Sequence, residues 1–162
     1  MGINWTYNGI DFTEDMIGDN YGFVYKITNL SNGRKYIGKK FFYSSKTKQV
    51  KGKKKKHKVA SNWQTYFGSS DILQKDVILY GQDNFKREII HLCLSKGICG
   101  YLEAKEQFVN NVLESDEYYN TWIMCRVRKS HIKDYNVRSL QTDRKSTRLN
   151  SSHIPLSRMP SS

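Results

Sequence analysis

The sequence predicts an α+β fold, in which a small, mainly antiparallel β-sheet is flanked by helices. Two segments rich in β-branched and aromatic residues lie between residues 21 and 38, separated by a run of turn-forming residues. A capped helical pattern, a third β-type segment and a second helical pattern follow in that order. This succession of elements is typical of a small mixed domain.

The first two β-type segments predict a hairpin with a defined register. If Leu30–Gly33 is a four-residue loop, Ile27 lies opposite Tyr36 and Tyr25 lies opposite Gly38, because antiparallel partners add to a constant number. Tyr25 and Tyr36 then share one face of the sheet, whereas a loop one residue different would separate them. The glycine opposite Tyr25 leaves space in which a substrate backbone could approach.

The helical patterns have recognisable ends. Ser70 is an N-cap candidate and Gly81 a stop signal for a helix of about three turns. The segment Phe85–Leu94 then predicts a strand, and a second helix is expected to open at Gly100. A further apolar stretch covers residues 118–127. The expected apolar face of the second helix consists of Tyr101, Leu102, Ala104, Phe108, Val109, Val112 and Leu113.

The 162 residues are enough for one compact domain, which we expect at residues 21–133. Residues 1–20 form an acidic N-terminal segment with four acids and no Lys or Arg. Residues 134–162 predict a disordered tail, because the apolar periodicity disappears beyond His131. Residues 143–162 resemble the translation of a sequencing adapter, and we therefore exclude them from the fold.

The chain is strongly basic, with 27 Lys and Arg against 15 Asp and Glu and a formal net charge of +12. Thirteen of the bases lie between residues 20 and 70, where there is no acid. Residues 44–60 are the densest part and predict a solvated loop, because neighbouring like charges repel each other. Such a surface is typical of nucleic-acid backbone binding. The lysines expected to make these contacts are Lys39, Lys46, Lys48, Lys51, Lys53, Lys54, Lys55, Lys56 and Lys58.

Other classes of function are disfavoured by the sequence. No window approaches 18 consecutive apolar residues, and the N-terminus lacks the basic and apolar regions of a secretory signal. We therefore expect a cytoplasmic protein without a membrane partner. The spacing of Cys93, Cys99 and Cys125 matches no standard zinc site and favours buried thiols.

The hairpin also contains a family motif. Phe23-Val-Tyr25, followed eleven positions after Tyr25 by Tyr36-Ile-Gly38, resembles the signature of the GIY-YIG nuclease superfamily. Downstream, Trp63, Tyr66–Ser70 and Tyr80–Ile89 are similar to its phage Seg-type branch, with a long insertion after the second tyrosine. The resemblance implies a GIY-YIG nuclease-like fold and a stand-alone, metal-dependent endonuclease that hydrolyses DNA phosphodiester bonds. A phage-encoded protein of this kind would act in the cytoplasm of the bacterial host, without an organic cofactor.

The resemblance also implies roles for particular residues. Tyr25 and Tyr36 would orient or activate the attacking water and contact the phosphate. A glutamate of the second helix would hold the divalent metal, for which Mg²⁺ is the expected ion. The family pattern favours Glu103, whereas a helical wheel places Glu106 beside the apolar stripe and Glu103 towards solvent. Both glutamates remain candidates at this point.

One family residue is missing, because no arginine follows the second tyrosine by about ten residues. Lys39, Lys40, Lys46 or Arg87 could supply the phosphate-stabilising charge, although a lysine lacks the bidentate fork of a guanidinium. Asn120 resembles the late asparagine that braces the family's site. The missing arginine suggests an alternative function, a non-catalytic nucleic-acid-binding protein with a decayed nuclease fold.

Overall fold

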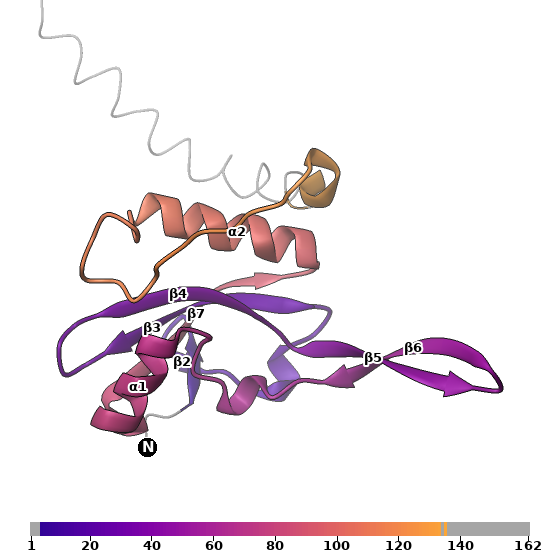
Figure 1. Cartoon of the computed structure of the whole chain (residues 1–162), viewed down its shortest axis with the longest axis horizontal. Coiled ribbons are helices and arrows are strands. Elements are labelled where there is room, and N and C mark those ends of the chain that lie inside the picture. The colour runs from indigo at the N-terminus through magenta and orange to yellow at the C-terminus, as the bar shows by residue number, and fades with distance from the viewer. Residues whose placement is uncertain (1–3, 134, 136–162) are drawn as a thin grey trace, which may run out of the picture. The chain divides into compact units, whose positions relative to one another are not determined.

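A five-stranded sheet forms the centre of the computed structural model, which describes residues 4–133 and 135 (Figure 1). The strands follow the order β2-β1-β7-β3-β4, and all neighbours are antiparallel except β1 and β7. The predicted α+β class with a mainly antiparallel sheet is therefore confirmed. The strands are β1 (Trp5–Tyr7), β2 (Ile10–Asp11), β3 (Gly22–Asn29), β4 (Lys35–Phe41) and β7 (Phe85–Cys93).

The N-terminal segment belongs to this sheet rather than preceding a separate domain. β1 and β2 lie at the edge beyond β7, and the 3-10 helix η1 (Glu14–Met16) leads to β3. Trp5, Phe12 and Ile17 are all buried in the core. The acids of this segment lie at exposed positions between apolar residues that point inward, so its charge alone was a poor guide to its position.

The predicted hairpin register is confirmed, since Ile27 pairs with Tyr36 and Tyr25 pairs with Gly38. The expectation of open space at Gly38 is wrong. A Cβ atom at this position would lie 2.6 Å from the Tyr25 hydroxyl oxygen and 2.8 Å from a carbon of the Tyr36 ring. Gly38 therefore makes room for the two tyrosine rings and not for a substrate backbone.

This close approach predicts the effect of a substitution. We expect Gly38→Ala to lower the free energy of unfolding by about 1–3 kcal/mol, because the added methyl group overpacks the space held by the tyrosine rings. Urea unfolding measures the change. Gly100→Ala is a matched control, since its Cβ would meet only Val127 at 3.9 Å within a helix, where alanine is preferred. Equal effects of the two substitutions would contradict the packing argument.

Two helices flank the sheet (Figure 1). The helix α1 (Asp71–Tyr80) begins at the predicted cap, where the Ser70 hydroxyl accepts a hydrogen bond from the Leu73 amide. The helix α2 (Lys96–Val109) begins earlier than expected, because Ser95 caps it in the same way. Short 3-10 helices occur at η2 (Trp63–Thr65), η3 (Gln82–Asn84) and η4 (Lys129–Ile132).

The predicted apolar face of α2 is partly wrong. Phe108 and Val109 in the last turn of α2, and Leu113 beyond its end, are exposed, whereas Leu102, Ala104 and Val112 are buried as expected. The buried residues of α2 are Ile98, Cys99, Leu102, Ala104 and Gln107.

The expected basic loop at residues 44–60 is a β-hairpin instead. The strands β5 (Tyr43–Val50) and β6 (Lys53–Ala60) pair along their whole length and extend away from the five-stranded sheet (Figure 1). Lys51 and Gly52 form the turn, and both have positive φ, as a type I′ turn requires. Every residue of the two strands except Tyr43, His57 and Val59 is exposed, so the lysines stay hydrated and do not prevent strand pairing.

The core is an aromatic cluster against the β3 side chains that face α1. Trp5, Phe23, Tyr25, Phe42 and Trp63 form edge and tilted ring contacts with centroid separations of 5.0–6.4 Å. This cluster fixes the tyrosine-bearing face of the hairpin and the segment between β6 and α1.

The chain divides after Val127 into two units, and the structure describes the second only at residues 128–133 and 135. The rest of the predicted tail, including the adapter-like segment at 143–162, lies outside the described residues. Within residues 4–133 and 135, no helix combines the length and apolar character needed to cross a membrane.

Candidate active site

A cavity of about 430 Å³ lies at the free edge of β4. Because β4 has no strand on its outer side, side chains from both faces of the sheet reach this edge. The start of α1 contributes from one face and the middle of α2 from the other, and the segment after Tyr118 closes the edge. The lining residues are Tyr36, Lys39, Ser69, Ser70, Asp71, Ile72, Glu103, Gln107, Tyr119, Asn120, Thr121, Trp122 and Met124.

Of the two tyrosines predicted for the site on the β3–β4 hairpin, Tyr36 is the one that lines the cavity. Its hydroxyl lies 3.0 Å from the Ser69 Oγ, and its ring packs against Gly68. Gly68 has a φ of 85°, and a Cβ there would lie 2.8 Å from Leu73. Burial raises the pKa of Tyr36 despite the hydrogen bond to Ser69, so Tyr36 presents a neutral hydroxyl to the cavity at neutral pH.

Tyr25 lies behind Tyr36 and is not part of the cavity lining. The centroids of these two rings are 6.1 Å apart, and the Tyr66 ring centroid lies 6.0 Å from that of Tyr25. Burial raises the pKa of Tyr25 well above its ordinary value, and the neighbouring Tyr66 and Tyr36 raise it further. Tyr25 is therefore placed to hold the Tyr36 ring in position.

Glu103 and Lys39 form an ion pair inside the cavity. The Glu103 side chain is only 13% exposed, and this burial raises the pKa of its carboxyl group. The hydrogen bond and charge of Lys39 act in the opposite direction and lower the same pKa. Glu103 on α2 and Lys39 on β4 thus bring a carboxylate and a cation into the cavity that Tyr36 also lines.

Glu106 points elsewhere, and the helical-wheel interpretation of α2 was wrong about the two glutamates. The Glu106 Oε1 lies 2.7 Å from the His91 Nε2, and Glu106 does not line the cavity. Its side chain is 25% exposed, compared with 13% for Glu103. The structure therefore places Glu103, and not Glu106, beside Tyr36.

Asn120 braces the edge strand at the floor of the cavity. Its side-chain oxygen accepts a hydrogen bond from the Ile37 amide at 3.1 Å, and its Nδ2 donates to the Ile37 carbonyl at 2.8 Å. Gln107 donates to the same carbonyl at 3.0 Å. These side chains replace a missing strand and fix the backbone between Tyr36 and Lys39.

The remaining candidates for the missing arginine lie outside the cavity lining. Lys40 points to the face of β4 opposite to that of Lys39. Its Nζ lies 4.1 Å from the centre of the Tyr66 ring and donates a hydrogen bond to the Asn62 side chain. The buried Arg87 donates to the carbonyl oxygens of Gln64 and Tyr66 at 3.0 and 2.8 Å. Arg87 thus holds the segment before α1.

Lys46 lies on β5. Among the four residues proposed to replace the missing arginine, Lys39 is the one that lines the cavity. The other lysines of the basic segment lie on the β5–β6 hairpin or its turn. The structure therefore separates the predicted residues into a cavity group and a hairpin group.

Several lining residues were missed by the sequence analysis. Ser69 was included only within the family-like range Tyr66–Ser70, and Gln107 was not singled out. Trp122 and Met124 were counted within an apolar stretch, although both are largely exposed at the cavity. No periodic pattern marks these two residues, because the segment is held by side-chain contacts and has no helix or strand of its own.

The described residues contain no group of three or more Cys, His, Asp or Glu that could hold a metal. Cys93 and Cys99 are buried, as expected, whereas Cys125 is exposed. Glu103 nevertheless fits a Mg²⁺ ion, because this ion is commonly bound through one or two carboxylates while substrate phosphates and water complete its shell. The cavity lining offers two carboxylates, those of Glu103 and Asp71.

The Lys39–Glu103 pair gives a direct expectation for titration. We expect Lys39→Met to raise the pKa of Glu103 further, because it removes the charge and the hydrogen bond that oppose the effect of burial. Carbon-detected NMR of the Glu103 carboxyl group measures this change. Lys40→Met is the matched control, since Lys40 lies on the other face of β4, and a similar rise in that variant would contradict the assignment.

The chain is similar to known proteins of one endonuclease family. Residues 5–123 match the family model described as "Putative endonuclease segE, GIY-YIG domain". Over 100 residues the chain is 31% identical to the "Putative endonuclease segE" of Enterobacteria phage T4, an alignment that covers 62% of this chain and 40% of that protein. The chain thus spans about two fifths of the length of this relative. No solved structure matches the chain.

Proposed function

Because the chain belongs to the segE-type GIY-YIG endonuclease family, we propose that it is a metal-dependent DNA endonuclease that hydrolyses phosphodiester bonds in the cavity beside β4. The observation that supports this most strongly is the meeting of Tyr36, Lys39 and Glu103 in one cavity. They provide a neutral hydroxyl, a cation and a carboxylate, the chemistry that phosphodiester hydrolysis requires.

Each of these residues has a distinct task in the proposed reaction. The Tyr36 hydroxyl, oriented by Ser69, hydrogen-bonds the attacking water or a phosphate oxygen. Because burial raises its pKa, Tyr36 positions the water and does not act as a strong base by itself. Lys39 compensates negative charge on the phosphate. A divalent ion held by Glu103 would supply Lewis-acid stabilisation of the phosphate and the leaving oxygen.

Substrate affinity is assigned to the β5–β6 hairpin. Its lysines extend from the sheet on two exposed strands, without an acidic residue between them. Contacts from such lysines to phosphates provide affinity that does not depend on base sequence. We therefore propose that Lys46, Lys48, Lys51, Lys53, Lys54, Lys55, Lys56 and Lys58 bind the DNA backbone.

One observation favours a second function, binding of nucleic acid without cleavage. Lys39 already pairs with Glu103, and no arginine of the described residues lines the cavity. If this ion pair persists when DNA and metal are present, Glu103 is not available as a ligand. The hairpin would then bind DNA without hydrolysis.

Plasmid conversion distinguishes the two functions. Supercoiled plasmid is incubated with the full chain and Mg²⁺, or with EDTA, and the nicked and linear forms are quantified. The endonuclease proposal predicts conversion in Mg²⁺ and none in EDTA. Retardation of the DNA on a gel without strand breaks under any of several divalent ions would favour the binding function.

A further inference from the structure

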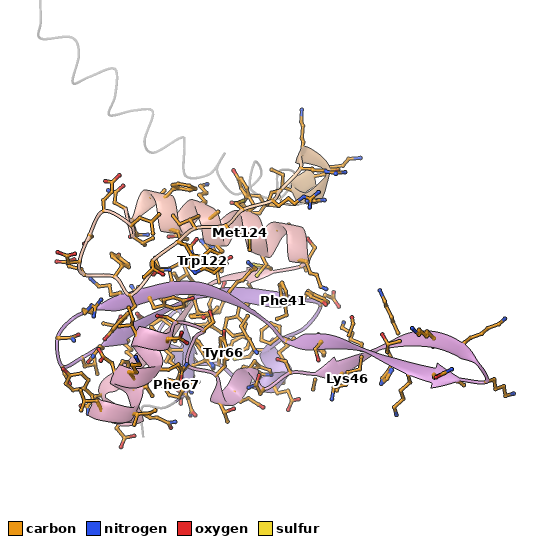
Figure 2. The ribbon with its side chains drawn as sticks, in the orientation of Figure 1. Phe41, Lys46, Tyr66, Phe67, Trp122 and Met124 are labelled. Atoms are coloured by element: carbon orange, nitrogen blue, oxygen red, sulfur yellow. The ribbon has the colours of Figure 1, made fainter. Side chains whose placement is uncertain are left out.

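The cavity lining includes three apolar side chains, together called the apolar wall, that the proposed hydrolysis does not use. Trp122 and Met124 belong to the segment after Asn120 and Ile72 to the start of α1, and their exposed fractions are 63%, 68% and 42%. Figure 2 shows Trp122 and Met124 on the α2 side of the sheet, opposite Tyr66 and Phe67. An exposed indole ring therefore lies in the same cavity as the groups assigned to the phosphate.

The wall is built on a fixed segment. Tyr119, three residues before Trp122, is buried, and its hydroxyl donates to Asp76 at 2.7 Å and accepts from Asn29 at 2.9 Å. Its amide donates to the Lys35 carbonyl, and Asn120 is held by Ile37. Trp122 therefore follows directly on an anchored stretch of chain and lines the same cavity as Tyr36, Lys39 and Glu103.

The chemistry of the cavity lining suggests what the apolar wall binds. The polar residues of the lining suit a phosphate, and a group joined to that phosphate can reach the apolar residues of the same cavity. In DNA, the flat group with an apolar face is the nucleobase, which stacks favourably on aromatic side chains. Within an intact duplex both faces of a base are covered by its neighbours. A free face becomes available only when the base is unpaired or extruded from the stack.

We propose that Trp122, supported by Met124 and Ile72, binds one unstacked nucleobase of DNA beside the scissile phosphate. This inference rests on the proposed endonuclease function and refines its substrate to DNA with an unpaired or extrudable base. Trp122 is a specificity-determining residue in this scheme. The hairpin lysines contribute affinity for either kind of DNA, because phosphate contacts do not distinguish stacked from unstacked bases.

Intrinsic fluorescence tests the inference without requiring cleavage. Trp5 and Trp63 are 2% and 4% exposed, so the emission that DNA can quench by contact comes from Trp122. The full chain is titrated in EDTA with a fully paired duplex, with the same duplex containing one bulged adenine, and with an oligothymidine strand. We expect the bulged duplex and the single strand to quench the emission much more strongly than the paired duplex.

Variants of the wall make the test specific. Trp122→Phe should abolish the quenching but retain most of the preference for bulged DNA, because phenylalanine still provides a stacking face. Trp122→Ala should weaken binding of the bulged duplex about 5- to 150-fold, the equivalent of about 1–3 kcal/mol of stacking, and affect the paired duplex little. Ile78→Ala is the control, since Ile78 is 84% exposed on α1 and does not line the cavity.

The outcomes separate this inference from the proposed function. Equal quenching by paired and bulged duplex, or binding of all three DNAs without quenching, would overturn the nucleobase site even if plasmid is cleaved. Selective quenching that Trp122→Phe abolishes supports the nucleobase site. If that quenching occurs while no metal yields cleavage of either the plasmid or the bulged duplex, the base site stands as a binding site and the endonuclease proposal fails.

Discussion

Glu103→Gln is expected to reduce Mg²⁺-dependent plasmid cleavage by at least about 10²-fold, because one electrostatic group of a hydrolytic site commonly accounts for an effect of this size. Glutamine keeps the length of the side chain but removes the negative charge that would hold the metal and pair with Lys39. Binding of DNA should change little, since the affinity is assigned to the hairpin. Initial rates of nicking and gel retardation in EDTA measure the two quantities separately.

Glu106→Gln is the matched control on the same helix. Glu106 contacts His91 and lies outside the cavity lining, so this variant should cleave at nearly the wild-type rate. The opposite result, with loss of cleavage in Glu106→Gln and normal cleavage in Glu103→Gln, would transfer the metal to the other glutamate. Normal cleavage in both variants would exclude each carboxylate as the required ligand.

Removing positive charge from the β5–β6 hairpin should produce the second large effect, a loss of affinity for DNA. The register places Lys46 and Lys48 on one face of the hairpin and Lys54 and Lys56 on the other. Replacing all four by glutamine should reduce the slope of the logarithm of the binding constant against the logarithm of salt concentration by about 3–4. Each phosphate contact releases counterions, so each lost contact makes the slope less steep. At about 0.1 M salt this corresponds to an affinity loss of at least about 10²-fold. Filter binding over a range of NaCl concentrations measures the slope.

Pairs of substitutions show whether both faces bind DNA. Lys46→Gln with Lys48→Gln, and Lys54→Gln with Lys56→Gln, each remove two charges and should each reduce the slope by about 2 if phosphates lie on both sides of the hairpin. A control pair in α1 and α2, Lys75→Gln with Lys105→Gln, removes the same charge at exposed positions outside the hairpin. A control slope that falls equally would show that only net charge matters.

The parts of the fold that were predictable depend on short-range rules. A four-residue loop and alternating side chains determine the register of β3 and β4, so the facing of Tyr25 and Tyr36 followed from the sequence. The cap at Ser70 is equally local. Each of these features involves residues close together in the chain, and the structure confirms them.

The choice between Glu103 and Glu106 depended on long-range structure. The direction of each carboxylate is set by where α2 begins, at the Ser95 cap, and by its packing across the edge of β4. The hairpin at residues 43–60 was missed for another reason, since charge repulsion was given more weight than the turn at Lys51–Gly52. Neither outcome is encoded in a local periodicity.

The bracing of β4 by Asn120 has a consequence for self-association of the protein. An open edge strand can pair with a strand of another molecule, and such pairing is the first step of edge-to-edge aggregation. Asn120 and Gln107 occupy the Ile37 hydrogen-bonding groups that an incoming strand would need. The side chains that shape the floor of the cavity therefore also leave an incoming strand no free backbone groups at Ile37, so loss of Asn120 or Gln107 would open this edge to strand pairing.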